Sequence, residues 1–95
     1  MKQHNPPHPG GFIYRTYLEP HDISAQQVAE HLGISHSHIS RIIAEQDAVT
    51  PDLAIRLSRV LGRSPQSWLQ MQMNYDLWRA EQAQPHKELK KLELA

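Results

Sequence analysis

The chain has 95 residues, no cysteine, and 10 lysines and arginines balanced by 10 aspartates and glutamates. This length fits one domain with one core, and the lack of cysteine excludes disulfides and thiolate metal sites. No segment approaches the roughly 20 apolar residues of a membrane span. The N-terminus also lacks the apolar run of a signal peptide. We therefore expect a cytoplasmic protein that does not contact a membrane.

The chain shows no strand signal, because no stretch alternates apolar and polar residues with β-branched enrichment. We therefore expect an all-α fold. Residues 1–8 contain prolines among polar residues, which predicts a mobile N-terminal arm. A first helix is expected to begin near Pro9 and to end at Pro20. Its apolar side chains are Phe12, Ile13, Tyr17 and Leu18.

The next two helices are expected to be short and joined by a tight turn. Ser24, with Gln27 three residues later, is a capping-box pattern that begins the second helix, and Gly33 ends that helix. Ser35 caps the third helix, which is expected to run to about Ala44. The apolar residues expected to lock this pair of helices together are Val28, Leu32, Ile34, Ile39 and Ile42.

These features are typical of a helix-turn-helix. Ala29 is small, which lets the two helices cross at close range, and Gly33 supplies the left-handed backbone of the turn. The alternative is an ordinary pair of bundle helices. In a helix-turn-helix, the second helix lies in the major groove of DNA, with its N-terminal residues at the base edges.

The third expected helix has a polar face opposite its isoleucines. Arg41 can donate two hydrogen bonds to guanine, while Ser37 and Ser40 are small enough to allow a close approach. His36 and His38 can bond a base edge or a phosphate, and the alternative for all of these residues is a solvated face. The residues expected to contact DNA are Gln26, Ser35, His36, Ser37, His38, Ser40 and Arg41.

Two further helices are expected, and each begins with a hydroxyl cap followed by proline. The caps are Thr50-Pro51 and Ser64-Pro65. The last helix is long and is expected to continue to about Ala83. The helix-turn-helix domain would then cover residues 9–84, and residues 85–95 would form a C-terminal tail.

Three arginines recur at helical spacing on the fourth expected helix, away from its apolar stripe. They are Arg56, Arg59 and Arg63. They could form a basic strip for an acidic partner or a phosphate, or they could form a solvated face.

The fifth expected helix is apolar on two sides. At about 100° per residue, one cluster lies roughly 160° away from the other. The first cluster is Trp68, Met71, Tyr75 and Trp78. The second cluster, which we expect to form a homodimer interface, is Leu69, Met73, Leu77 and Ala80. A C-terminal tail that folds back over this second cluster is the alternative.

The sequence contains no pattern for a metal site, a cofactor or catalysis. His36 and His38 lie about 200° apart around a helix, so they cannot chelate one ion from the same face. The chain has no HExxH pattern, Gly-rich phosphate loop or nucleophile elbow. We therefore expect a protein that is not an enzyme and that binds no metal or cofactor.

Several short motifs resemble the HigA-type antitoxins, or plasmid-maintenance antidote proteins, of the Xre-like helix-turn-helix group. The matching segments are His8-Pro9-Gly10, Tyr17-Leu18-Glu19-Pro20, Ala29-Glu30-His31-Leu32-Gly33-Ile34-Ser35, Ser40-Arg41-Ile42-Ile43, Thr50-Pro51-Asp52-Leu53-Ala54-Ile55-Arg56-Leu57, Ser64-Pro65-Gln66-Ser67-Trp68-Leu69 and Tyr75-Asp76-Leu77-Trp78. The resemblance spans about residues 8–81, and its last two segments are the more specific ones.

The resemblance implies a five-helix, lambda-repressor-like helix-turn-helix domain with a long C-terminal helix. It implies an antitoxin of a type II toxin–antitoxin module that binds operator DNA and represses its own operon. It also implies a cognate toxin partner, a RelE-like mRNA-cleaving protein of the HigB type, which the antitoxin neutralises.

One segment departs from the family pattern. Family members often carry a glycine and basic residues after the third helix, whereas this chain has Glu45-Gln46-Asp47-Ala48. Two acidic residues there are expected to repel phosphate, so either DNA affinity is lower or the loop sits differently from that of the family. The alternative function is therefore an orphan helix-turn-helix regulator, or a protein-interaction module, with weak DNA binding.

Overall fold

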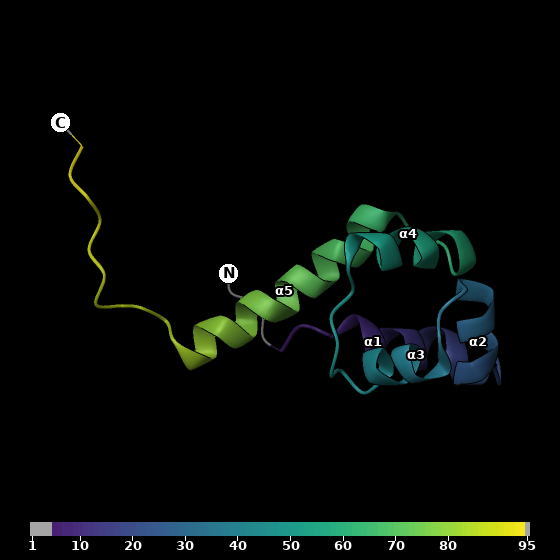
Figure 1. Cartoon of the computed structure of the whole chain (residues 1–95). Helices are drawn as coiled ribbons and strands as arrows, with labels where there is room; N and C mark the ends of the chain where they lie inside the picture. Colours follow the sequence, from purple (N-terminus) through teal and green to yellow (C-terminus); the bar gives the residue numbers. More distant parts are fainter. Residues whose placement is uncertain (1–4, 95) are drawn as a thin grey trace.

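The computed structural model describes residues 5–94, and within this range every regular element is helical. The order is α1 (Pro9–Ile13), η1 (Tyr14–Leu18), α2 (Ala25–Leu32), α3 (His36–Ile43), α4 (Pro51–Val60) and α5 (Pro65–Ala83). The predicted all-α fold with a long last helix is confirmed, and α1 to α4 gather at one end of α5 (Figure 1).

The helix boundaries follow from the predicted caps. The hydroxyl groups of Ser24, Ser35, Thr50 and Ser64 each accept a hydrogen bond from the backbone N–H three residues later. Such a cap satisfies one of the free donors in the first helical turn, which is why the helix begins there.

The first expected helix is confirmed, but its second half is wound more loosely than an α-helix. η1 is a π-helical turn, in which the Glu19 N–H donates to the Tyr14 carbonyl at 2.9 Å. The Ile23 N–H then donates to the Leu18 carbonyl, also at 2.9 Å. These two bonds order the backbone around Pro20, between η1 and the start of α2.

The expectation of a mobile arm over residues 1–8 is wrong for Pro6 and His8. Both residues are buried, whereas residues 1–4 lie outside the described range. The His8 Nδ1 accepts a hydrogen bond from the Gly10 N–H at 2.9 Å and so caps α1. Its ring also packs edge-on against Tyr75 of α5, with the centroids 4.8 Å apart.

The core lies where α1, η1, α2, α3 and α4 meet the first half of α5. Trp68 is fully buried there, and its indole N–H donates to the Gly62 carbonyl at 2.9 Å. The buried apolar residues of the core are Ile13, Leu18, Val28, Ala29, Leu32, Ile39, Ile42, Val49, Leu53, Ala54, Leu57, Trp68 and Met71.

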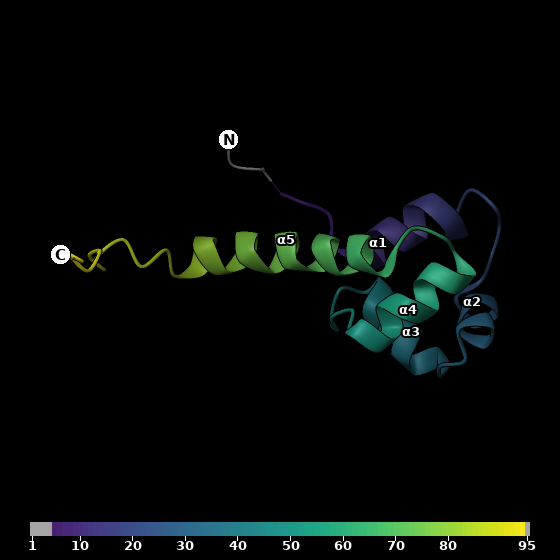
Figure 2. The same ribbon diagram turned by 90° about the horizontal axis from the view of Figure 1, so that it is seen from above.

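Beyond the core, α5 projects into solvent. The molecule measures 56 × 24 × 23 Å along its principal axes, and the free half of α5 with the tail accounts for the long dimension (Figures 1 and 2). The described part of the tail is exposed and extends away from the helices. None of the described helices combines the length and the apolar character needed to cross a bilayer.

Candidate nucleic-acid interface

The turn between α2 and α3 has the expected helix-turn-helix geometry. Ser24 and Gln27 form a reciprocal capping box, with bonds of 2.9 and 3.1 Å. Gly33 ends α2 in the left-handed region, at φ 71° and ψ 32°, where glycine is least strained. The Ser35 Oγ then accepts from the His38 N–H at 3.0 Å and begins α3.

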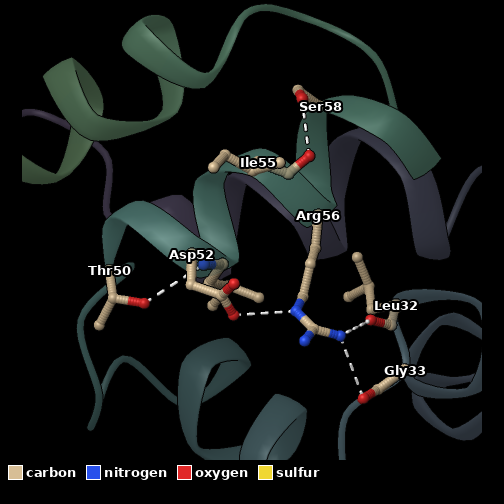
Figure 3. A network of polar contacts seen from close by, with 8 residues as sticks. Leu32, Gly33, Thr50, Asp52, Ile55, Arg56 and Ser58 are labelled. Carbon is tan, nitrogen blue, oxygen red and sulfur yellow. Dashed lines mark hydrogen bonds and ion pairs between the residues drawn. The ribbon is translucent and has the colours of Figure 1, made fainter.

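Arg56 of α4 reaches across to this turn and supports it (Figure 3). Its Nη1 donates to the carbonyls of Leu32 and Gly33, at 2.8 and 3.3 Å. Its Nε donates to the Asp52 carboxylate, one helical turn earlier, at 2.9 Å. A cation placed on the free carbonyls at the end of α2 is favoured by the helix dipole as well as by the hydrogen bonds.

The three arginines of α4 and its following loop therefore do not form a basic strip. The Arg56 guanidinium is hydrogen-bonded to the α2–α3 turn. The Arg63 guanidinium lies over the rings of Phe12 and Trp68, at 5.1 and 5.7 Å from their centroids. Arg59 and Arg63 are both exposed, as the predicted solvated face requires, whereas Arg56 is half-buried.

The predicted DNA-contacting residues fall into two groups by exposure. Ile39 and Ile42 are buried beneath α3 and leave its opposite face outward. His38 and Ser40 are half-buried at the margins of that face, and the Ser35 hydroxyl is occupied as a cap. The exposed members of the predicted set are Gln26, Ser35, His36, Ser37 and Arg41.

Arg41 is held by two neighbours on the outward face of α3. Its Nε donates to the Asp47 carboxylate at 2.8 Å, and its Nη1 donates to the Ser37 hydroxyl at 3.1 Å. The side chains of Arg41 and Asp47 stay 49% and 40% exposed. The guanidinium is thus oriented while it remains open to solvent.

The two acidic residues after α3 do not stand free beside this face. Asp47 is paired with Arg41, and Glu45 lies against α1. There its Oε2 comes within 2.8 Å of the position that a Cβ on Gly11 would occupy. Asp47 is therefore not an unpaired carboxylate on this face, and the expected weakening of DNA binding stays a prediction.

Gln72 anchors the loop between α3 and α4 and was not predicted. This buried side chain accepts from the Val49 N–H at 2.8 Å and donates to Asp76 at 3.0 Å. The sequence analysis also missed the ion pair of Asp47 with Arg41 and the hydrogen bonds of Arg56 to the α2–α3 turn. The i, i+4 spacing of Asp52 and Arg56 was the one available signal, and it indicates only their ion pair.

His8 is the second buried polar residue near this loop. Burial lowers the pKa of His8 below its usual 6.5, and the nearby charge of Glu45, the backbone of Asp47 and the charge of Asp76 offset this only in part. The ring therefore stays neutral when an exposed histidine begins to protonate.

Three of the four predicted dimer-interface residues lie on the part of α5 that leaves the core. Leu69 packs partly against the core, whereas Met73 and Leu77 are 52% and 56% exposed and Ala80 is exposed. On the opposite cluster, Trp68 and Met71 are buried. The second apolar face is thus open in the single chain, and the tail, as far as residue 94, does not fold back over it.

Comparison with known proteins gives matches in both sequence and structure. Residues 15–68 match the family model described as helix-turn-helix. Virulence-associated protein I of Dichelobacter nodosus is 47% identical over 75 residues, which cover 79% of this chain and 69% of the relative.

Solved structures resemble almost the whole chain. Antitoxin GraA has a TM-score of 0.86 at 31% identity, over 92% of this chain and 97% of GraA. The Pseudomonas aeruginosa antitoxin HigA, solved with the higBA promoter, has a TM-score of 0.83 at 33% identity. That match covers 93% of this chain and 96% of HigA.

Proposed function

Because this chain belongs to the helix-turn-helix family, and within it to the HigA antitoxins, we propose that it binds operator DNA as a homodimer, represses its own operon and neutralises a toxin. The toxin would be RelE-like, mRNA-cleaving and of the HigB type. These activities take place in the cytoplasm.

The outward face of α3 is the observation that carries the DNA-binding part of the proposal. It is presented by a turn that Gly33 and Arg56 hold in one geometry. It offers one oriented arginine among small or polar side chains. A helix of this kind fits the major groove, where each base pair shows a distinct pattern of donors and acceptors.

We assign the contacts by exposure. Arg41 reads a guanine, and Ser37 and His36 lie beside it on the first turns of α3. Gln26, exposed in the first turn of α2, contacts the DNA backbone. Ser35, His38 and Ser40 complete the margin of the interface, with Ser35 acting mainly as the cap.

Replacing Arg41 tests the base-reading role. Arg41→Ala is expected to cost about 1–3 kcal/mol of binding on the promoter upstream of the gene for this chain, and much less on random DNA. A lost base contact reduces discrimination, whereas a lost phosphate contact weakens binding to all sequences alike. The measurement is a gel shift on both duplexes at one fixed salt concentration.

His36→Ala serves as the comparison on the same face. It removes an exposed side chain without removing the bidentate donor. Equal losses on both duplexes for Arg41→Ala would make Arg41 a clamp on the DNA backbone. An absence of any preference for the promoter in the unaltered protein would favour the alternative of a protein-interaction module.

The dimer is supported by the open face of α5. An isolated helix is only marginally stable in water, and an apolar stripe on it needs a partner. Met73 and Leu77 form such a stripe beyond the core. A second copy of the chain provides the matching stripe under two-fold symmetry, and two recognition helices then meet two operator half-sites.

The toxin is supported by family membership. The direct experiment takes a small protein encoded by a neighbouring gene and co-expresses it with this chain. Growth arrest by that protein alone, relieved when this chain is present, is the expected result. Arrest that persists despite a soluble, co-expressed chain would contradict the antitoxin role.

A further inference from the structure

We propose that Asp47 is a specificity-determining residue that positions Arg41 for base reading, an inference that rests on the DNA-binding function proposed above. Asp47 comes from the loop after α3 and would not itself touch a base. It acts by fixing the arginine that does.

The two contacts of Arg41 leave the reading end of the side chain free. A guanidinium has five N–H donors. One on Nε bonds Asp47 and one on Nη1 bonds Ser37. The remaining donors include one hydrogen on Nη1 and both on Nη2, which are enough for a bidentate contact to guanine O6 and N7.

Bonds at two different nitrogens also fix the plane of the guanidinium. Arginine otherwise loses several rotatable bonds of freedom when it is immobilised on DNA. Ordering such a side chain weakens binding by about two- to tenfold. A side chain that is already oriented in the free protein avoids part of this loss, as does a rigid, planar donor group.

The loop that carries Asp47 is itself held at both ends. The backbone N–H groups of Gln46 and Asp47 donate to the Arg41 carbonyl, at 2.8 and 3.3 Å. Two residues further on, the buried Val49 N–H is bound to Gln72 of α5. The Asp47 carboxylate is therefore delivered from a fixed backbone, rather than from a free loop.

The pair also changes the balance between specific and general DNA binding. Asp47 offsets the positive charge of Arg41, so the pair attracts phosphate less than a free arginine would. An exposed ion pair contributes little to folding stability. Its effect is instead to lower affinity for all DNA while retaining the directional contact to a base.

The experiment compares Asp47→Ala, Asp47→Asn and the control Glu45→Gln. Glu45→Gln removes an acid from the same loop without touching Arg41. Each variant is measured on the promoter duplex and on a scrambled duplex of equal length and composition. The quantity compared is the specificity ratio, which is the dissociation constant for the scrambled duplex divided by that for the promoter duplex.

Asp47→Ala is expected to raise affinity for scrambled DNA and to lower the ratio about two- to tenfold, the equivalent of one disordered side chain. Asp47→Asn retains a neutral acceptor and should fall between Asp47→Ala and the unaltered protein. Glu45→Gln should shift both affinities together and leave the ratio unchanged. In an Arg41→Ala background, Asp47→Ala should no longer change the ratio.

A measurement without DNA tests the contact between Arg41 and Asp47 by itself. The Arg41 Nε–H should give a slowly exchanging NMR signal in the unaltered protein and in Glu45→Gln. The signal should exchange rapidly in Asp47→Ala. Rapid exchange in the unaltered protein would overturn the proposed positioning.

The outcomes separate this inference from the proposed function. If the protein prefers its promoter and Asp47→Ala leaves the ratio unchanged, the proposed function stands and the inference about Asp47 is overturned. A higher ratio after Asp47→Ala would mean that Asp47 restrains Arg41 instead of aiming it, which also overturns the inference. A chain with no promoter preference overturns both.

Discussion

Gly10 and Gly11 are neighbours in α1 and are both buried, yet they face different surroundings. A Cβ on Gly10 would lie 1.7 Å from the Ile42 carbonyl oxygen in the backbone of α3. A Cβ on Gly11 would meet the ends of the Arg15 and Glu45 side chains, at 2.7 and 2.8 Å. Backbone cannot move aside cheaply, whereas a long side chain can rotate.

Gly10→Ala is therefore expected to destabilise the fold by about 3 kcal/mol or more, at or above the usual range for overpacking. Gly11→Ala should stay within about 1 kcal/mol of the unaltered protein, because alanine also favours the helix. Urea unfolding at one fixed protein concentration measures both. Similar losses for the two variants would contradict this account of the α1–α3 contact.

His8 gives the chain a pH-dependent stability of predictable sign. Its pKa is lowered in the folded state, so below about pH 6.5 the unfolded chain binds a proton that the folded chain does not. The stability supplied by neutral His8 is complete above that pH. It decreases as the pH falls from 6.5 toward the folded-state pKa.

His8→Asn retains an acceptor for the Gly10 N–H and removes the titration. We expect a flatter dependence of unfolding free energy on pH between about 7.5 and 5 than in the unaltered protein. The exposed His36, replaced by asparagine, serves as the matched control. A slope that survives His8→Asn would assign it to other groups.

At the scale of elements, the α2–α3 turn depends on a side chain from α4. Arg56→Met keeps most of the aliphatic stem and removes the donors to Leu32 and Gly33. We expect a loss of about 1 kcal/mol, because the side chain is partly exposed and water replaces some of the contact. Arg59→Met, one turn along the same helix, should cost less than about 0.5 kcal/mol.

Thermal or urea unfolding measures the two variants side by side. Hydrogen exchange adds a local reading, since faster exchange of the Gly33 and Ile34 amides is expected in Arg56→Met alone. If Arg59→Met proved as costly, a general charge effect on α4 would explain the result better than support of the turn.

The starts of the helices could be predicted because each depends on a local signal. Ser24, Ser35, Thr50 and Ser64 bond to amides only three residues away. The outward position of Arg41 also followed from helical periodicity. These features need no knowledge of the tertiary fold.

The features that were missed depend on contacts between distant residues. Gln72 bonds Val49 across 23 positions, and Arg56 reaches Leu32 across 24. His8 is not among the usual capping residues, and prolines beside it indicated a mobile arm. Asp47 could be seen as an acid, but its partner was set by the path of a loop that Gln72 anchors.

At the scale of the whole molecule, the projecting half of α5 is expected to pair with a second copy. Met73→Glu together with Leu77→Glu should convert a dimer to a monomer, because two charges would be buried against apolar side chains. Leu69 is left intact, since it also packs on the core of its own chain. Sedimentation at micromolar concentration measures the mass.

Ile55→Glu is the control for this experiment. Ile55 is 50% exposed and belongs to α4 rather than to the free half of α5, so its replacement should leave the dimer intact. A double variant of α5 that remained dimeric would place the interface elsewhere, and a monomeric Ile55→Glu would place it on α4.

The length of α5 has a consequence for the DNA that such a dimer selects. The helix is 19 residues long, begins in the core that supports α3 and ends well outside it. In a dimer joined along this rod, the two reading heads cannot slide relative to one another. The dimer then fixes the distance between its two α3 helices, and this distance decides which spacing of half-sites it can bind. Binding to a series of operators with stepwise longer spacers would measure this selection.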